Sequence, residues 1–243
     1  MTTQVKYSVV VPTLNEKDNI APLVEAIEAS GLTDYEIVIV DENSPDGTYD
    51  EAVRISEDKP FLTPMLNEGN PGLSPSIVQG FSRAKGKFLC CMDGDLQHDI
   101  AALPRLFKTL EDNYDMVIGS RYVEGGGFKE KWSLSRVIIS RTAALMTKIL
   151  LHVDVKDPMS GYFLIRKDVF EEVKPRLNPK GFKIMLELLC LLESSEKKYR
   201  ITESGIIFGL RIHGESKLSF RVIFQFLQSL LDMRKSIGKN SSR

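Results

Sequence analysis

The chain has 243 residues, 42% of them hydrophobic, which is enough for one large domain with a substantial core. Its 32 basic and 33 acidic residues give a net charge of −1, so the overall charge gives no sign of a nucleic-acid partner. Two of the three cysteines are adjacent inside an apolar run, which favours buried thiols in a reducing compartment over a disulfide framework. We expect a cytosolic chain with neither a secretory leader nor a membrane-spanning segment of its own.

Apolar runs bounded by turn residues alternate with helix-like patterns along the first half of the chain. The predicted strands cover residues 5–11, 35–40 and 87–92, and the predicted helices cover residues 19–29, 48–56, 76–84 and 101–110. This alternation is typical of an α/β fold whose parallel strands are joined by crossover helices. After a short strand at residues 115–119 the rhythm stops, and a long apolar segment with interspersed basic residues covers residues 133–151.

Polar clusters follow three of the predicted strands. They are Pro-Thr-Leu-Asn-Glu at residues 12–16, Asp-Glu-Asn-Ser-Pro-Asp-Gly-Thr at residues 41–48 and Asp-Gly-Asp-Leu-Gln-His at residues 93–98. Ligands of open parallel sheets bind outside the carboxyl ends of the strands, so the three clusters are candidate parts of one site. None of them is followed by the glycine pattern of a dinucleotide-binding fold or by the lysine of a P-loop.

The third cluster has the residue types of a metal site. Asp93 and Asp95 flank Gly94, which would let the backbone turn and bring the two carboxylates together. Asp95 and Gln97 form an all-oxygen set that suits Mg²⁺ or Mn²⁺, whereas an imidazole ligand from His98 would favour Mn²⁺ or Zn²⁺. An isolated Asp-x-Asp pair is also common in solvated turns and helix caps, so the pair alone leaves both interpretations open.

The second cluster is rich in turn formers, and Ser44 or Asp46 could cap the helix that follows. Turn chemistry does not explain Asp41 and Glu42, which follow an apolar strand whose end should be covered. A carboxylate in such a place needs hydrogen-bond donors, and we expect ribose hydroxyls or a base edge to supply them. The three clusters together predict a nucleotide-sugar cleft.

Six motifs in one order carry a resemblance to a known family. They are Val-Val-Val-Pro-Thr-Leu-Asn-Glu at residues 9–16, Val-Asp-Glu-Asn-Ser-Pro-Asp-Gly-Thr at 40–48, Met-Asp-Gly-Asp-Leu-Gln-His at 92–98, Gly-Ser-Arg-Tyr at 119–122, Asp-Pro-Met-Ser-Gly-Tyr-Phe at 157–163 and Arg-Ile-His-Gly-Glu-Ser-Lys-Leu at 211–218. The sequence resembles the dolichyl-phosphate mannosyltransferases within the inverting family 2 glycosyltransferases. The resemblance implies a GT-A type, Rossmann-like nucleotide-sugar-binding fold with a mostly parallel central sheet over residues 1–218. We expect residues 219–243 to add a C-terminal amphipathic helix and a short disordered tail.

The resemblance also implies roles for individual residues. Nucleotide contacts fall on Pro12, Leu14, Glu16, Ile39 and Asp41. The family's metal ligands match Asp95 and Gln97, with Asp93 and Gly94 also at the donor. The basic residues that hold the phosphates match Arg121, Arg211 and Lys217, which with Asp93 and Asp95 form the expected catalytic set.

An acceptor that is a lipid phosphate is already an anionic nucleophile, so it needs positioning more than a strong general base; if a carboxylate assists, Asp93 is the better candidate. Arg136 and Ser140, one helical turn apart, match residues that receive the acceptor phosphate in the family, although Arg136 could also be a snorkelling arginine on an amphipathic helix. The motif at residues 157–161 is expected to be a tight turn into a strand, with Asp157 at most orienting arginines. The segment between Arg211 and Lys217 could close over the diphosphate as a lid.

For its substrates, the resemblance implies GDP-mannose as donor, dolichyl or another polyprenyl phosphate as acceptor, and Mg²⁺ or Mn²⁺. We expect peripheral binding at the cytoplasmic face of a membrane, the endoplasmic reticulum in a eukaryote or the plasma membrane in a prokaryote, with small membrane-anchoring subunits as further partners. Trp132 and the segments 133–151 and 220–233 could lie in the membrane interface, and residues 217–243 carry six basic residues against one acidic, a net charge of +5. Both segments could instead pack on the sheet or on a second subunit.

Glu42, where the family more often has aspartate, and Gly94, where alanine is usual, leave the selectivity for base and sugar open. A polyprenyl-phosphate glucosyltransferase that uses UDP-glucose and a non-catalytic nucleotide-sugar-binding subunit therefore remain as alternatives. A phosphohydrolase is disfavoured, because its Asp-x-Asp pair would follow the first strand and precede a threonine.

Overall fold

The computed structural model describes residues 5–67, 69, 72–129, 134–151, 153–179, 181, 183–209 and 230. The strands are β1 (Tyr7–Thr13), β2 (Tyr35–Asp41), β3 (Leu62–Leu66), β4 (Phe88–Cys91), β5 (Met116–Ser120), β6 (Gly127–Phe128), β7 (Phe163–Arg166), β8 (Ile201–Gly205) and β9 (Ile207–Phe208). The helices are α1 (Lys17–Glu28), α2 (Thr48–Ser56), α3 (Leu73–Arg83), α4 (Leu103–Glu111), α5 (Leu134–Leu151), α6 (Lys167–Val173) and α7 (Ile184–Glu193), with short 3-10 helices at Ile100–Ala102 and Lys174–Arg176.

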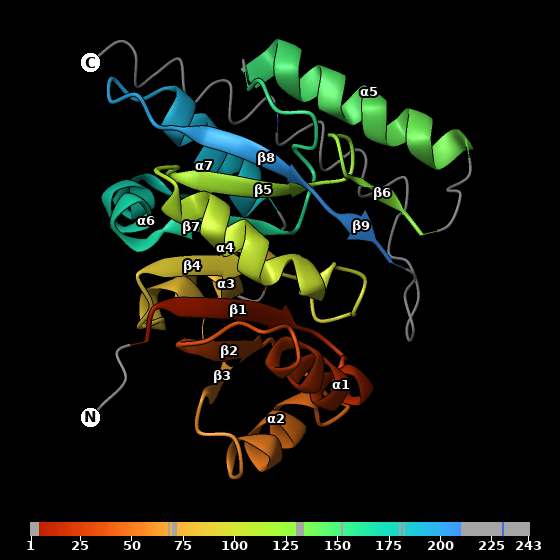
Figure 1. The fold of residues 1–243 in the computed structure, drawn as a ribbon, viewed down its shortest axis with the longest axis vertical. Coiled ribbons are helices and arrows are strands. Elements are labelled where there is room, and N and C mark those ends of the chain that lie inside the picture. The colour runs from red at the N-terminus through yellow and green to blue at the C-terminus, as the bar shows by residue number, and fades with distance from the viewer. Residues whose placement is uncertain are drawn as a thin grey trace.

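The main sheet has seven strands in the order β3-β2-β1-β4-β7-β5-β8 (Figure 1). β7 is antiparallel to both of its neighbours, β4 and β5, while the other pairs are parallel. Two reversals cancel, so β5 and β8 run in the same direction as β1, β2, β3 and β4. Six strands therefore end at one edge of the sheet, and β7 begins there. A second, two-stranded sheet pairs β6 with β9 in parallel.

Hydrophobic side chains fill the space on both faces of the sheet. Along β1, Val10 packs on one face with α3, α6 and α7, while Val9 and Val11 pack on the other face with α1 and α4. This alternation follows from the two-residue period of a strand. A strand that is covered on both faces needs apolar residues on both, which is why most positions of β1 and β2 are apolar in the sequence.

The sequence predictions for the first half of the chain are confirmed. Residues 5–11, 35–40 and 87–92 contain β1, β2 and β4 with shifts of a few residues, and the predicted helix at 48–56 coincides with α2. The strand at residues 115–119 is β5. We expected the alternation of strands and helices to stop after β5, and this was wrong. β7 and β8 complete the same sheet, and α6 and α7 cover one of its faces. β3 was not predicted from the sequence. Pro64 and the half-buried side chains of this strand weaken its apolar pattern.

All three cysteines are buried thiols, as the sequence indicates. Burial raises the pKa of the Cys90 and Cys91 thiols well above the usual value, so both stay protonated and act as small apolar residues.

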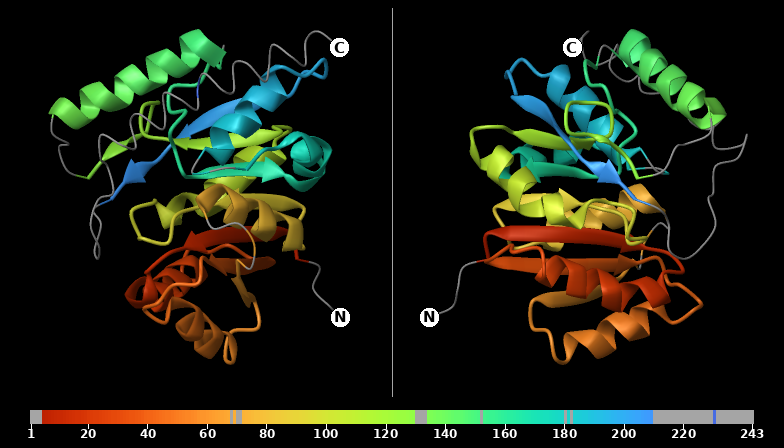
Figure 2. Two further views of the ribbon diagram at one scale, coloured as in Figure 1. Left: turned by 180° about the vertical axis from the view of Figure 1, so that it is seen from behind. Right: turned by 45° about the vertical axis from the view of Figure 1, so that its right-hand side comes forward.

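Helix α5 lies at the outer end of the molecule near β8, at the far end from α2, in each of the three ribbon views (Figures 1 and 2). Its last turns carry Met146, Leu150 and Leu151 into the core on one side, while Leu145 and Ile149 are 58% and 61% exposed. Within the described residues, no helix is both long enough and apolar enough to span a bilayer.

Gly80 sets the distance between α3 and the sheet. A Cβ atom at this position would overlap Cγ1 of Val10 and lie 3.0 Å from Cγ2 of Val40. We expect Gly80→Ala to lower the free energy of unfolding by about 1–3 kcal/mol, because α3 must move away from β1 and β2. Urea denaturation checks this. Ser82→Ala, at an exposed site in the same helix, is the control and should stay within about 0.5 kcal/mol of the parent; equal effects of the two substitutions would contradict the packing argument.

Candidate active site

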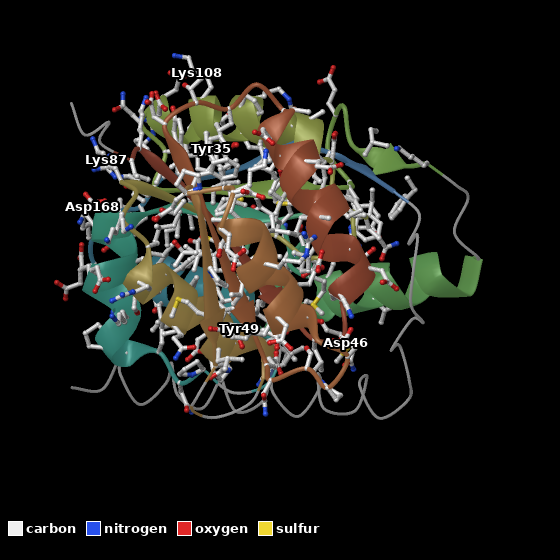
Figure 3. The ribbon with its side chains drawn as sticks, turned by 90° about the horizontal axis from the view of Figure 1, so that it is seen from below. Tyr35, Asp46, Tyr49, Lys87, Lys108 and Asp168 are labelled. Carbon is white, nitrogen blue, oxygen red and sulfur yellow. The ribbon has the colours of Figure 1, made fainter. Side chains whose placement is uncertain are left out.

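The three polar clusters lie together at the edge where the parallel strands end. Asp41 is the last residue of β2, the 12–16 cluster follows β1, and the 93–98 cluster follows β4. Arg121 follows β5 at the same edge. Figure 3 shows Asp46 at one end of the sheet and Lys87 and Asp168 at the other, which separates the candidate site from the amino ends of the strands. The convergence expected from the sequence is therefore confirmed.

Asp41 is completely buried, and its hydrogen-bond donors come from the chain itself. Oδ1 accepts from the hydroxyls of Thr13 (2.9 Å) and Ser44 (2.6 Å), and Oδ2 accepts from the Ser44 backbone N–H (2.7 Å). The expectation that only a ribose or a base would account for this carboxylate is therefore wrong. Asp41 joins the end of β1 to the loop after β2, and a contact of Asp41 with the nucleotide stays a prediction.

Three further hydrogen bonds join the loop after β1 to the loop after β2. The backbone N–H groups of residues 15, 16 and 17 donate to side chains of the second cluster, namely Ser44 Oγ (2.9 Å), Thr48 Oγ1 (3.0 Å) and Asp46 Oδ2 (3.2 Å). Glu16, at the N-cap of α1, makes no side-chain cap bond of its own. Side chains of residues 44–48 thus accept the backbone N–H groups at the start of α1. These hydrogen bonds fix the loop after β1, which is expected to contact the nucleotide.

Asp46 supports the first turn of two helices. Besides accepting from Lys17 in α1, it accepts through Oδ1 from the backbone N–H (3.0 Å) and the hydroxyl (2.5 Å) of Thr48 in α2. The N-cap residue of α2 is Gly47, and Asp46, one residue earlier, accepts the first N–H of the helix. Burial acts to raise the pKa of Asp46, but the hydrogen bonds from Thr48 and Lys17 outweigh it and hold the pKa below the usual value.

The loop of residues 93–98 is shaped by His98 and Leu96. The Asp93 backbone N–H donates to Nδ1 of His98 (3.0 Å), and Nε2 lies 3.6 Å from Asp93 Oδ2. The imidazole is 5% exposed and stacks on Tyr162 with a centroid distance of 4.9 Å. His98 therefore braces the loop rather than offering Nδ1 to a metal. The backbone bends over residues 94–96, which includes the turn expected at Gly94, and Leu96 adopts a left-handed conformation with φ of 62°.

Asp95 and Gln97 sit in the middle of this loop. Asp95 is 4% exposed, and its Oδ1 accepts from the Gln97 backbone N–H (3.1 Å). Gln97 also pairs with Gly209, donating from Nε2 to the Gly209 carbonyl (3.2 Å) and accepting the Gly209 N–H at its own carbonyl (2.6 Å). The acidic loop is thereby tied to the chain immediately before residues 210–217.

A cavity of about 190 Å³ lies against Asp93. Its lining residues are Leu73, Asp93, Pro158, Met159, Ser160, Gly161, Lys183, Met185 and Leu186. A Cβ atom on Gly161 would lie 2.9 Å from Oδ2 of Asp93, so only glycine leaves the carboxylate in this place. The motif at residues 157–161, predicted as a turn into a strand, leads into β7 as expected and also forms a wall of this cavity.

Arg121 and Asp157 form a buried ion pair beside the loop. Nε and Nη2 of Arg121 donate to the two oxygens of Asp157 (2.8 and 2.7 Å), and the Arg121 backbone N–H donates to Oδ2 (3.0 Å). The guanidinium is also 5.3 Å from the Phe208 ring centroid and 5.6 Å from that of Tyr122. Burial acts to lower the pKa of Arg121, but the bond to Asp157 outweighs it and raises the pKa, so the charge is permanent. The expectation that Asp157 orients an arginine is confirmed.

The other expected site residues fall into two groups. Pro12 ends up buried in β1, Leu14 is 37% exposed, and the side chain of Ile39 is buried in the core, so Ile39 has only its backbone to offer a ligand. Arg136 and Ser140 belong to α5, but their side chains lie outside the described residues, as do Arg211 and Lys217 entirely. Among the described residues, no three His, Cys, Asp or Glu side chains gather around a common metal position.

Sequence reasoning missed three groups that shape this edge: the hydroxyls of Thr13 and Ser44, the Gly161 contact with Asp93, and Glu203. Thr13 and Ser44 stand inside quoted motifs, so asking which groups satisfy a buried Asp41 would have found them. Glu203 lies in β8 and accepts the backbone N–H groups of Lys156 and Asp157. No pattern around Glu203 in the sequence predicts this contact, because it depends on the pairing of β8 with β5.

A family model for glycosyl transferase family 2 matches residues 8–174. The chain is also 39% identical to a dolichol-phosphate mannosyltransferase of Pyrococcus furiosus over 96% of its own length and 65% of the relative's, and 39% identical to the enzyme of that name from Saccharomyces cerevisiae over 94% and 87%. A protein of the same name from Mycosarcoma maydis is 37% identical over 93% and 78%. The chain thus spans slightly less than two thirds of the archaeal relative. It belongs to glycosyl transferase family 2.

Solved structures support the fold. Glucosyl-3-phosphoglycerate synthase from Mycobacterium tuberculosis, in a complex with Mn²⁺, uridine diphosphate and phosphoglyceric acid, has a TM-score of 0.71 and 20% identity, covering 94% of this chain and 78% of the synthase. The same synthase in a complex with Mg²⁺ and uridine diphosphate also has a TM-score of 0.71, with 19% identity, covering 95% of this chain and 79% of the synthase. The α/β fold with a mostly parallel central sheet, expected from the sequence, is confirmed.

Asp46→Asn removes the acceptor for the Lys17 N–H while leaving an amide oxygen for Thr48. We expect a loss of about 0.5–1 kcal/mol of unfolding free energy at neutral pH. The pKa of Asp46 is lowered by folding, so its contribution is complete above the usual value of 3.8 and disappears as the pH falls through the lower folded value. Denaturation at pH 7 and in acid checks this. Asp50→Asn, at an exposed aspartate in the first turn of α2, should show a smaller effect, and a penalty that persists at low pH would contradict the assignment.

Proposed function

We propose that the chain is an inverting glycosyltransferase that moves mannose from GDP-mannose to dolichyl phosphate, or another polyprenyl phosphate, and supplies the lipid-linked mannose for glycan or GPI-type assembly. The observation that carries this is the convergence, at one sheet edge, of the acidic loop, the Arg121–Asp157 pair and the loop that Asp41 braces. The relatives that share this sequence over more than nine tenths of the chain are named for mannose transfer to dolichol phosphate.

Asp95 and Gln97 would hold a Mg²⁺ or Mn²⁺ ion. The residues fit this role, because a carboxylate and an amide oxygen are hard donors, and such ions in phosphate-handling sites are bound through one or two carboxylates and completed by substrate phosphates and water. The lack of a three-ligand cluster among the described residues is consistent with such an open site. When bound, the cation would offset the negative charge of the donor's diphosphate.

The basic residues of the chain act on the leaving group. As the glycosidic bond breaks, the nucleoside diphosphate gains negative charge, so fixed cations stabilise the transition state more than the ground state. Arg121 is suited to this task, because the fork to Asp157 holds its guanidinium at the carboxyl end of β5 before any ligand arrives. Arg211 and Lys217, which lie outside the described residues, are proposed to act on the diphosphate in the same way, as the resemblance implies.

The acceptor phosphate attacks the anomeric carbon from the side opposite the diphosphate, which inverts the configuration. As an anion it needs no strong base, and the protein's contribution is to place it in line and to exclude water. Asp93 lies at the cavity of about 190 Å³ with a 40% exposed side chain, which suits hydrogen bonding to the sugar or acceptor better than structural support. Arg136 and Ser140 on α5 are the proposed acceptor-phosphate ligands.

Binding to the cytoplasmic face of a membrane brings the lipid to this edge. The exposed Leu145 and Ile149 of α5, beside the exposed Lys148, form an interfacial surface of the kind that inserts shallowly among lipid headgroups. The net charge of +5 over residues 217–243 would add attraction to anionic lipid. Small membrane-anchoring subunits remain proposed partners.

Transfer of labelled sugar from a panel of GDP- and UDP-sugars to a polyprenyl phosphate in detergent, with Mg²⁺ or Mn²⁺ and with chelator, tests the proposal. We expect labelled lipid from GDP-mannose and loss of product with chelator. Lipid labelled from UDP-glucose instead would keep the reaction class and change the donor. Tight nucleotide binding with no product from any donor would favour the non-catalytic binding subunit.

Asp95→Asn retains an oxygen for the Gln97 N–H but removes the charge that would face the cation. We expect transfer to fall by about 100-fold or more with little change in unfolding free energy. Steady-state kinetics beside thermal denaturation of the same preparation measure both effects, and Asp95→Ala should behave alike. Asp112→Asn, an exposed carboxylate at the end of α4, is the control; transfer at the parent rate by Asp95→Asn would remove the metal argument.

A further inference from the structure

Glu203, in the middle of β8, reaches across to the loop that carries Asp157. Its two carboxylate oxygens accept from two consecutive backbone N–H groups, Oε2 from Lys156 (2.7 Å) and Oε1 from Asp157 (3.0 Å). A carboxylate that clamps two adjacent amides fixes the position of the loop backbone, because neither amide can move without losing a charge-assisted hydrogen bond.

Asp157 in turn determines where the Arg121 guanidinium lies. Asp157 is 1% exposed, and its two oxygens accept three N–H groups of Arg121. The fork holds one edge of the planar guanidinium, which sets its direction as well as its distance. A shift of the Asp157 backbone is therefore passed directly to the cation at the candidate site.

The strand that carries Glu203 contacts the site at two more points. β8 leads into β9, where the Phe208 ring lies 5.3 Å from the Arg121 guanidinium and 5.6 Å from the His98 ring. Gly209 then pairs with Gln97. The segment from Glu203 to Gly209 thus holds Arg121 through Asp157 on one side and the acidic loop on the other.

We propose that Glu203 is a positioning residue for transfer, acting on Arg121 through the backbone of Asp157. The inference rests on the proposed function, in which Arg121 stabilises the leaving diphosphate. Glu203 does not touch the substrate; it keeps the guanidinium in the orientation that meets the charge as it develops. Such preorganisation matters because a displacement of about 1 Å in a stabilising group is enough to lose much of its effect.

A double-mutant cycle tests this. Glu203→Ala should lower kcat/KM about ten-fold in the parent chain, through kcat more than through KM. Glu203→Gln, whose amide nitrogen cannot accept, keeps one of the two bonds and should lose less. In an Arg121→Ala chain the further loss from Glu203→Ala should shrink to about two-fold or less, because the group that Glu203 positions is gone. Arg121→Lys, which keeps a cation but cannot fork to Asp157, serves as a second background in case Arg121→Ala does not fold.

Asp115→Asn is the matched control. Asp115 accepts the Arg200 backbone N–H (2.7 Å) just before β5 and β8 begin, at the opposite edge of the sheet. It should lower the melting temperature about as much as Glu203→Gln while leaving kcat/KM unchanged. An equal loss of activity in Asp115→Asn would mean that Glu203 acts only through stability.

A second readout does not depend on activity. In the parent chain the Arg121 Nε–H should exchange slowly with solvent in nuclear magnetic resonance spectra, and Glu203→Ala should speed this exchange at least about ten-fold. Unchanged exchange would overturn the inference. A loss of kcat/KM from Glu203→Ala that is as large in the Arg121→Ala chain as in the parent chain would overturn it too. Lack of transfer by the parent chain with every donor would count against the proposed function, and the exchange measurement would still judge the role of Glu203.

Discussion

Polar groups that are buried at the ends of strands must find hydrogen-bond partners inside the chain, and this requirement organises the whole candidate site. Asp41 is satisfied by Thr13 and Ser44, Asp157 by Arg121, and the Asp93 backbone by His98. Leaving a buried polar group without a partner costs about 1–3 kcal/mol, and breaking a buried ion pair such as Arg121–Asp157 costs about 3–5 kcal/mol. The Asp41–Thr13 and Asp157–Arg121 pairs also join segments next to different strands, whereas the Asp93–His98 pair holds a single loop together. The loops at this edge are consequently held in one arrangement before any substrate is present.

Much of this arrangement was readable from the sequence. The apolar runs of β1, β2 and β4 are unambiguous because helices cover both faces of the sheet, and parallel strands ending at one edge bring the polar clusters together. The predicted convergence followed from topology alone and needed no knowledge of side-chain contacts. The turn before β7 was expected from the apolar run that follows residues 157–161, and the link between Asp157 and an arginine was expected from the resemblance of that motif to the family.

The failures have physical causes too. The turn expected at Gly94 is part of a bend over residues 94–96, but the left-handed conformation of Leu96 within it was not predicted, because leucine rarely adopts it. Asp41 appeared to need a ligand, because its donor Thr13 lies 28 residues away and the nearby Ser44 was considered only as a possible helix cap. β8 and Glu203 were missed because their structural roles depend on pairings between residues tens of positions apart, which no local sequence pattern indicates. The roles assigned to Arg211 and Lys217 stay predictions, since both residues lie outside the described part of the chain.

The antiparallel strand β7 has a consequence for how the chain is made. β3, β2, β1 and β4 are complete once residue 91 has been synthesised, and they pair with one another without help. β5 is different, because both of its neighbours, β7 and β8, come later in the chain. β5 is fully buried in the folded chain and ends at residue 120, whereas β7 begins at residue 163. During synthesis, both hydrogen-bonding edges of β5 therefore stay unpaired while more than 40 further residues are added. Exposed apolar strand edges invite pairing with other chains, so the nascent chain is open to mispairing at β5 until β7 has been synthesised.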